Sequence, residues 1–271
     1  MTLVPLDTGV ALEVQEFGSG PAVLFLHGGA MTHRVWDHQV AAAMGSHRAI
    51  AYDLRGAGGS DKPSSGYSVE AFAEDLAALV TRLDLERPAI VGHGLGAHVA
   101  LRLAATRPEL VGALVLAAAA PWFVGDRAAD GGGFPDELWA RMRAGAGRNR
   151  AQADLDLIDG AFFHREPGEA LRAWCLQMAL AWPLPVFVQF AASLGEVDHR
   201  DALGAIEAPV LLMHGRHDRK TRYEGAEYLA GRLANARLVT FEESAHCPHV
   251  EEPQRFNEVL LEFLAPAASP G

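Results

Sequence analysis

The chain has 271 residues, of which 49% are apolar and 21% are charged, as is ordinary for a soluble globular protein. This length allows one large α/β domain, or one domain with an insertion, and a sizeable core. The 23 basic and 34 acidic residues give a formal net charge of −11 without a cluster of Lys or Arg, so we expect neither nucleic acid nor a membrane as a partner.

Cysteine use and the N-terminus indicate the compartment. Cys175 and Cys247 are too few for a disulfide framework, and their spacing matches no zinc site. The N-terminus has no basic segment followed by an apolar one, so we expect no signal peptide, and the most apolar stretch, Val111–Trp122, is too short to span a bilayer. We therefore expect a cytoplasmic protein without a metal or cofactor; the sequence does not indicate an oligomeric state.

Seven short runs of β-branched and aliphatic residues predict strands. They are Ala11–Phe17, Ala22–Leu26, Arg48–Tyr52, Ala89–Gly92, Ala113–Ala118, Val210–His214 and Arg237–Phe241. The runs around Leu24, Ile90 and Leu211 are apolar on both faces, as a buried parallel strand requires. A turn signal at residues 18–21 predicts that the first two strands pair as an antiparallel hairpin.

Longer amphipathic stretches predict helices that cover a mostly parallel, twisted sheet on both faces. They are Arg34–Met44, Val69–Leu83, Leu95–Ala105, Arg222–Leu233 and Gln254–Leu264. The alternation of strands and helices breaks after residue 122. A glycine loop at 131–133 is followed there by helical stretches at Asp136–Ala144, Ala151–Phe162, Glu169–Leu180 and Leu184–Leu194. We therefore predict a core of residues 1–122 and 201–271, with a helical cap, residues 123–200, inserted in it and a disordered tail at Ala265–Gly271.

A glycine-rich turn joins the predicted strand at 89–92 to the following helix. Its sequence is Gly-His-Gly-Leu-Gly, in which Gly92 and Gly96 match the flanks of the G-x-S-x-G nucleophile elbow. Gly94 occupies the position of the serine. The flanking glycines let strand and helix approach closely, and the central residue takes a strained backbone conformation at the helix N-terminus.

The same segment also fits a dinucleotide-binding loop. Gly92, Gly94 and Ala97 satisfy the G-x-G-x-x-G/A pattern between a strand and a helix. That loop usually opens its domain, whereas at least three predicted strands precede this one. The next strand also ends at residues 117–121 without an acidic residue to bind a ribose. Both observations disfavour a Rossmann domain.

Two later segments supply an acid and a histidine. Asp218 follows a late buried strand and ends the G-x-x-D pattern of residues 215–218. His246 lies in a loop after the last strand, and Pro248 and acidic residues follow it. The order nucleophile position, aspartate, histidine differs from the orders in the chymotrypsin and subtilisin folds.

Two upstream segments complete the pattern. His27-Gly28-Gly29 matches the H-G-x-x oxyanion loop, and residues 53–63 match a D-x-R-G-x-G-x-S-x-x-P turn that we interpret as structural. With four matches in this order, each at the end of a predicted strand, the sequence resembles the capped α/β-hydrolases, in the broad group of haloperoxidase-like esterases, lactonases and carbon–carbon-bond hydrolases. The resemblance covers nearly the whole chain, and the cap is its least diagnostic part.

The resemblance implies a mechanism with a nucleophile, a histidine base and an aspartate. It assigns these catalytic positions to Gly94, His246 and Asp218, and the oxyanion hole to the backbone N–H groups of Gly29 and Leu95. Cys247 adjoins the histidine, but we expect its side chain to point away from the elbow.

The expected substrate is a small, apolar organic ester or lactone, with a β-diketone-like substrate of a carbon–carbon-bond hydrolase as the alternative. The aromatic residues of the cap are expected to be mostly core, with some lining the pocket, and we name Trp122 and Trp182 as candidate substrate-binding residues. The histidines at positions 93, 98, 217 and 249 are expected to be structural or at the surface.

Glycine at position 94 removes the nucleophile, so this chain is not expected to form an acyl-enzyme. Gly94 is either an engineered replacement of a parental serine, which the otherwise intact machinery favours, or native. If it is native, His246 and Asp218 would serve as a general base for lyase, isomerase or cyclase chemistry. A non-catalytic binder is a third interpretation, which the retained Asp218 and His246 disfavour, because a binder has no need of them.

Overall fold

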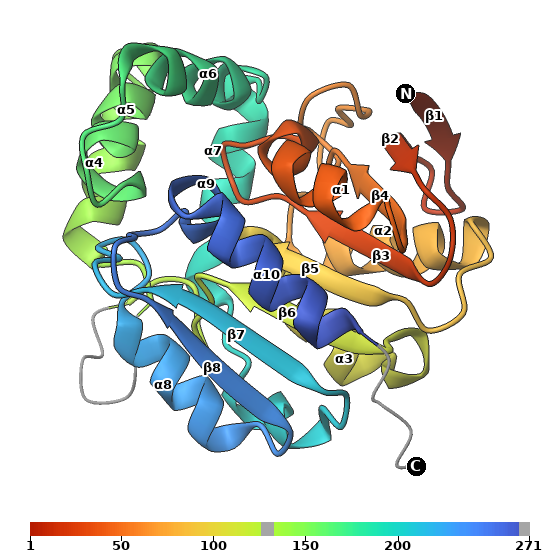
Figure 1. Ribbon diagram of the computed structural model, residues 1–271. Coiled ribbons are helices and arrows are strands. Elements are labelled where there is room, and N and C mark those ends of the chain that lie inside the picture. The colour runs from red at the N-terminus through yellow and green to blue at the C-terminus, as the bar shows by residue number, and fades with distance from the viewer. Residues whose placement is uncertain (126–132, 266–271) are drawn as a thin grey trace, which may run out of the picture.

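The computed structural model describes residues 1–125 and 133–265, which form an eight-stranded sheet with helices around it (Figure 1). The strand order is β1-β2-β4-β3-β5-β6-β7-β8. Their bounds are β1 Thr2–Pro5, β2 Ala11–Phe17, β3 Ala22–Leu26, β4 Arg48–Tyr52, β5 Ala89–His93, β6 Ala113–Ala117, β7 Val210–Gly215 and β8 Ala236–Phe241. Most of the predicted glycine loop at 131–133 and most of the predicted tail, residues 265–271, lie outside the described residues.

All seven predicted strands are confirmed, with ends that differ by one residue at most. Strands β3 to β8 run parallel, and only β1 and β2 are antiparallel to their neighbours. The strand β1 was not predicted. It is a four-residue edge strand that ends in Pro5 and is largely exposed, so it carries no alternating apolar pattern.

The predicted hairpin between the first two predicted strands is wrong. Strand β2 pairs antiparallel with β4, and β3 lies on the far side of β4, where it pairs parallel with β4 and β5. The burial patterns give the reason: β2 alternates between buried and half-exposed residues, whereas β3 and β4 are buried on both faces and need central places. The turn at 18–21 instead packs Gly18 (φ +77°) against the backbone of Met44 and His47.

Helices cover both faces of the sheet, as predicted. In Figure 1, α1 and α10 lie side by side on one face, and α2 and α3 pack together on the other. The helix bounds in the core are α1 Asp37–Ala43, α2 Val69–Arg82, α3 Leu95–Thr106, α8 Tyr223–Arg232, α9 Pro248–Glu251 and α10 Pro253–Leu264. Ser68 caps α2 by accepting a hydrogen bond from the N–H of Ala71 at 3.3 Å.

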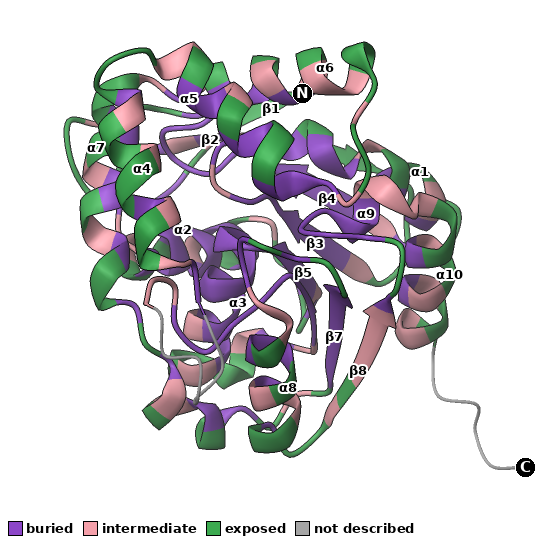
Figure 2. Ribbon diagram, turned by 90° about the vertical axis from the view of Figure 1, so that its left-hand side faces the viewer, coloured by how far each residue is buried: buried purple, intermediate pink, exposed green. Residues whose placement is uncertain are grey.

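The insertion between β6 and β7 is helical, which confirms the predicted cap. It contains α4 Asp136–Ala146, α5 Arg150–Leu157, α6 Glu169–Leu180 and α7 Leu184–Ser193, and a π-helical turn, Ile158–Phe162, follows α5 directly. Figure 1 shows these helices gathered at one end of the sheet. Figure 2 shows the central strands β3, β5 and β7 largely buried and the outer surfaces of α4 and α7 exposed, so the cap closes over one end of a continuous core.

No helix in the described residues is both long enough and apolar enough by itself to cross a bilayer. One bent pair, Glu169–Leu180 with Leu184–Glu196, satisfies the length and composition together, with an angle of 83° between its halves.

Candidate active site

The turn at residues 92–96 joins β5 to α3 with Gly94 in an uncommon backbone conformation. Gly94 is the N-cap of α3, and its backbone has φ 50° and ψ −109°. A Cβ on Gly92 would lie 2.4 Å from the carbonyl oxygen of Gly96, and a Cβ on Gly96 would lie 2.3 Å from that of Leu26. The flanking glycines therefore let α3 pack directly on β3 and β5, as the elbow interpretation predicts.

Replacing Gly96 by alanine is expected to lower the free energy of unfolding by about 3 kcal/mol, because the new methyl group meets the rigid backbone of β3. Urea denaturation measures this change. Gly231→Ala, in α8, is the control: its Cβ meets nothing within 4 Å, and alanine stabilises a helix by about 0.5–1 kcal/mol. Equal stability of the two variants would contradict a close strand–helix approach at Gly96.

His246 and Asp218 form a buried hydrogen-bonded pair. The Nδ1 of His246 donates to Oδ2 of Asp218 at 2.9 Å, and the side chains are 1% and 0% exposed. Because Nδ1 carries the proton in this bond, the lone pair of the neutral ring is on Nε2. The dyad predicted from the sequence has the geometry of a histidine base and its orienting carboxylate.

The Asp218 carboxylate is held from several sides. Its Oδ1 accepts from the N–H groups of Lys220 and Thr221, both at 2.8 Å, and Nε2 of His214 lies 3.3 Å from Oδ2. Burial alone would raise the pKa of Asp218, but the neighbouring His246 and His214 hold it well below its usual range. Asp218 is therefore a carboxylate throughout the neutral pH range.

Burial lowers the pKa of His246 to about 4; the carboxylate of Asp218 opposes this shift, and the charge of Lys220 adds to it. The ring is therefore neutral at pH 7. His93 fixes the loop that carries His246, because its Nε2 donates to the carbonyl oxygen of His246 at 2.8 Å. Burial also raises the pKa of the neighbouring Cys247 thiol well above its usual value, so this side chain is not a thiolate nucleophile at neutral pH.

Gly94 lies directly opposite the base. A Cβ on Gly94 would stand 3.4 Å from Nε2 of His246, which is ordinary van der Waals contact. That Nε2 is buried and has no hydrogen-bond partner among the described residues. A hydroxyl on this Cβ would be within hydrogen-bond reach of the imidazole, so the backbone here has the geometry of a serine–histidine pair with no serine.

The loop that carries Gly29 is fixed by His27. The N–H of Leu54 donates to Nε2 of His27 at 3.0 Å, and Nδ1 of that ring therefore donates to the carbonyl oxygen of Gly28 at 2.8 Å. Leu95 is the first residue of α3, where an N–H has no partner within its helix. In residues 1–125 and 133–265, neither Gly29 nor Leu95 uses its N–H in a backbone hydrogen bond. Both groups are thus free to serve as oxyanion donors.

The two candidate tryptophans occupy different places. Trp182 is buried beside the loop that carries Gly29: its Nε1 donates to the carbonyl oxygen of Met31 at 2.7 Å, and its ring lies 6.0 Å from that of His27. Trp122 instead packs against Tyr228 of α8 at 6.2 Å, with the guanidinium of Arg200 4.9 Å from its ring. The structure therefore brings Trp182, but not Trp122, to the loop of the expected site.

Two phenylalanines that were not singled out contact the site from the cap. A Cβ on Gly29 would be 3.1 Å from the ring of Phe190 in α7, and the ring centroid of Phe162 lies 5.9 Å from that of His246. The carbonyl oxygen of Phe162 also accepts from the N–H of Cys247 at 3.2 Å. Their apolar character alone did not distinguish them from the other aromatic residues of the cap.

The other histidines considered from the sequence, which were expected to be structural or at the surface, pack against neighbouring rings. Nδ1 of His98 is 3.1 Å from Nε2 of His199, and the ring of His249 lies 4.5 Å from those of Trp36 and His93. His217 stacks on His164 at 3.7 Å.

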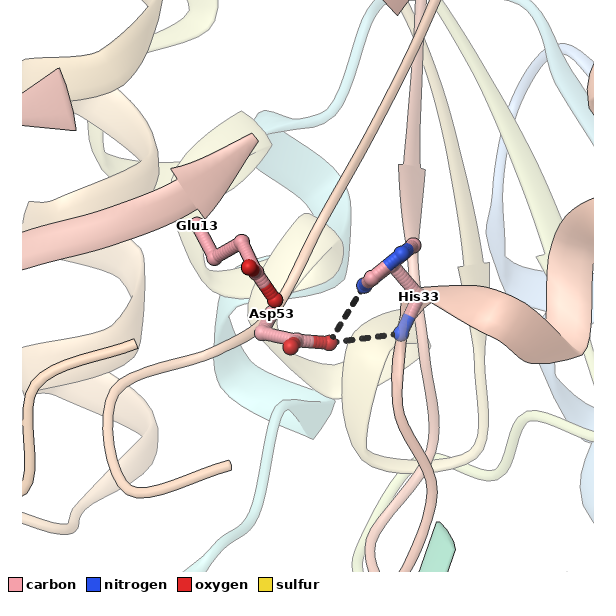
Figure 3. A group of neighbouring side chains, drawn as sticks. All are labelled: Glu13, His33 and Asp53. Carbon is pink, nitrogen blue, oxygen red and sulfur yellow. Dashed lines mark hydrogen bonds and ion pairs between the residues drawn. The ribbon is translucent and has the colours of Figure 1, made fainter. Parts of the chain in front are cut away.

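Glu13, His33 and Asp53 meet beside the glycine-rich turn at residues 53–63, with possible metal-binding atoms within 4.8 Å of one another (Figure 3). Both oxygens of Asp53 are already used: Oδ1 accepts from N and Nδ1 of His33 at 2.7 and 2.9 Å, and Oδ2 accepts from the N–H of Gly59 at 2.9 Å. The cluster therefore fixes the turn, in agreement with its structural interpretation.

Comparison with known proteins agrees with this geometry. Residues 21–253 match the model of the alpha/beta hydrolase fold family. The chain is 32% identical to a non-heme chloroperoxidase of Streptomyces lividans, over 97% of this chain and 99% of the relative, and 31% identical to a pimeloyl-[acyl-carrier protein] methyl ester esterase of Aeromonas hydrophila, over 94% and 100%. An esterase from Exiguobacterium antarcticum superposes with a TM-score of 0.92 at 29% identity, covering 98% of this chain and 99% of that one. The chain belongs to the alpha/beta hydrolase fold family.

Proposed function

We propose that the site binds the carbonyl group of an ester or lactone as a hydrolase does, and that Gly94 leaves it without its nucleophile. The observation that carries the proposal is the 3.4 Å between a Cβ at position 94 and Nε2 of His246. The position, the base and the orienting carboxylate are those of a nucleophile–histidine–aspartate hydrolase, and Gly29 and Leu95 supply the oxyanion donors. The esterase relatives support the same class of substrate.

The chemistry follows from the missing hydroxyl. A serine Oγ would give its proton to Nε2 of His246 and bond to the carbonyl carbon, and the oxyanion would lie against the N–H groups of Gly29 and Leu95. Glycine retains binding and polarisation of the carbonyl but forms no acyl-enzyme. The otherwise intact machinery supports the interpretation of Gly94 as a replacement of a parental serine. We place the cap at residues 123–200, with the core on either side of it.

A serine-directed fluorophosphonate tests the proposal. Gly94→Ser is expected to react with it at the new serine, with loss of fluoride and a matching mass increase in the intact protein. The unmodified chain and Gly94→Ala are the controls and should stay unlabelled. Adding His246→Gln to the serine variant should slow labelling by at least 100-fold, because a positioned base contributes about 10²- to 10⁴-fold. If Gly94→Ser labels no faster with His246 than without it, the proposal is wrong.

A second candidate function uses the dyad without a nucleophile. It is favoured by the buried Nε2 of His246, which has a free lone pair at neutral pH. A histidine with a pKa of about 4 is a weak base, so it would act on a proton already made acidic by a carbonyl group polarised in the oxyanion hole. Such chemistry is of the lyase, isomerase or cyclase kind. Exchange of α-protons of a bound lactone in D₂O, monitored by NMR and lost in His246→Gln, would separate it from simple binding.

A further inference from the structure

Lys220 is a buried cation that the proposed chemistry does not use. It is one of only two lysines in the chain, the other being Lys62. The residue is 8% exposed and lies two positions after Asp218, to whose carboxylate its own N–H donates. Its ammonium lies 4.8 Å from the ring centroid of Phe162 and 5.7 Å from that of Phe134, both in the insertion between β6 and β7.

The ammonium forms no ion pair within the described part of the chain. No hydrogen bond or ion pair joins Nζ of Lys220 to a residue in 1–125 or 133–265, and the Asp218 oxygens are taken by backbone N–H groups and by His246 and His214. Removing an ammonium from water without an acceptor is unfavourable, and the cation–π contacts with Phe162 and Phe134 offset only part of that cost. The charge of Asp218 acts on the ammonium from beyond ion-pair distance, and the ammonium N–H donors of Lys220 have no acceptor among the described residues.

The ammonium adjoins the dyad of His246 and Asp218. The ring of Phe162 lies beside both the ammonium of Lys220 and the imidazole of His246. The groups that feel the charge are Asp218, Cys247, His246 and His93. Burial lowers the pKa of Lys220 to about 8, so the side chain is still mainly protonated at pH 7.

We propose that Lys220 binds a carboxylate of the substrate, which makes the substrate class an ester or lactone that carries a free carboxylate rather than a wholly apolar one. The inference rests on the proposed function, because it places the carboxylate in the same site as the reacting carbonyl. The aromatic rings of Phe134 and Phe162 exclude water from the ion pair and so strengthen it. The apolar walls of the cap accommodate the chain that joins carboxylate and carbonyl.

Two esters of similar size test the substrate class. In the Gly94→Ser background, the kcat/KM for mono-p-nitrophenyl glutarate is compared with that for p-nitrophenyl butyrate. Lys220→Met is expected to lower the ratio of the two by about 30-fold or more, because truncating one member of a buried charge pair costs at least about 2 kcal/mol. Lys220→Arg should restore most of the ratio. Lys62→Met, at an exposed lysine, is the control and should leave it unchanged.

Direct binding separates this inference from the proposed function. On the unmodified chain, calorimetry with monomethyl glutarate should detect binding that Lys220→Met weakens by a similar factor. Lys220-dependent binding together with an inert Gly94→Ser would overturn the proposed function and support the role of Lys220. A Gly94→Ser that hydrolyses both esters with a ratio insensitive to Lys220→Met would overturn the role of Lys220 alone.

Two further readouts address folding and covalent chemistry. Thermal unfolding of Lys220→Met should show that the variant is folded at the assay temperature, and its kcat/KM for p-nitrophenyl butyrate, which carries no carboxylate, should be retained, so loss of selectivity would not be a folding defect. Borohydride reduction in the presence of a keto acid should leave the mass of the protein unchanged. A stable adduct on Lys220 would overturn the ion-pair role, because it would identify the amine as an imine-forming nucleophile.

Discussion

Gly94→Ser is expected to raise the rate of ester hydrolysis by a factor on the order of 10⁴ to 10⁶ over the unmodified chain. Loss of the nucleophile from a serine hydrolase costs about 10⁶ in kcat, and what remains comes from the oxyanion hole and binding. Gly94 faces Nε2 of His246 at a distance that suits a serine, so the reverse change should recover most of that factor. Initial rates against a panel of activated esters and lactones measure it.

The backbone at position 94 makes alanine the matched control. Serine and alanine both place a Cβ at φ 50° and ψ −109°, where a non-glycine residue costs about 1–3 kcal/mol. Both variants should therefore unfold at a lower temperature than the glycine chain, by similar amounts, and only the serine variant should gain activity. A serine variant no more active than the alanine variant on every ester and lactone would contradict a hydrolase site at Gly94.

Acidification from pH 6.5 towards pH 4 is expected to unfold the protein. Six buried histidines have a lowered pKa, for which burial is the main cause: about 4 for His27, His199 and His246, about 3 for His249, and well below the usual value for His93 and His98. Between pH 6.5 and 4 the unfolded chain binds protons at these positions and the folded chain does not. Stability is therefore complete above pH 6.5 and falls with pH in this window.

The size of the effect follows from the number of protons. Each histidine lowers the free energy of unfolding by about 1.4 kcal/mol per pH unit. Three of the six would therefore lower it by about 4 kcal/mol per unit, against a total of about 5–15 kcal/mol. Glu251 offsets the effect of one histidine. Burial raises the pKa of Glu251 to about 7, so its contribution to the stability of the fold increases as the pH falls from 7 to 4.5. Thermal unfolding midpoints measured from pH 7.5 to 4.5 should fall steeply.

Single substitutions assign the acid sensitivity to buried rings. His249→Gln removes a histidine that packs between Trp36 and His93, and it should reduce the steepness of the pH dependence by about one proton. His38→Gln, at an exposed position of α1, should leave the steepness unchanged. Unfolding midpoints that stay level down to pH 4.5 would show that these rings accept protons in the folded state.

Local sequence patterns predicted the elements of this fold better than their pairing. The doubly apolar runs of β3, β5 and β7 and the glycines around Gly94 report local environment, and the structure confirms their interpretation. The pairing of β2 with β4 depends on residues far along the chain, so the turn at 18–21 suggested a hairpin that does not form. Short, exposed β1 carried too little pattern to be seen.

The candidate site also has residues that local motifs predicted and residues that only the packing of the cap reveals. Asp218 and His246 follow strand ends in recognisable motifs, and the topology alone brings them together. The contacts of Phe162 and Phe190 depend on how the cap helices are oriented, which periodicity does not reveal. The one sequence signal for Lys220 was its position two residues after the predicted acid. The burial of its charge becomes visible only when Phe134 and Phe162 are in place.

The hydrogen bond from the N–H of Cys247 to the carbonyl oxygen of Phe162 ties the π-helical turn of the cap to the loop of His246. An opening that moves the backbone of Phe162 away from the His246 loop breaks this bond, so the cap and the base are linked through one amide. Hydrogen exchange at Cys247 would then count the opening events of the cap, and a ligand that holds the cap closed would slow it. The exchange rate of the Cys247 amide next to the base is therefore expected to depend on how often the cap opens.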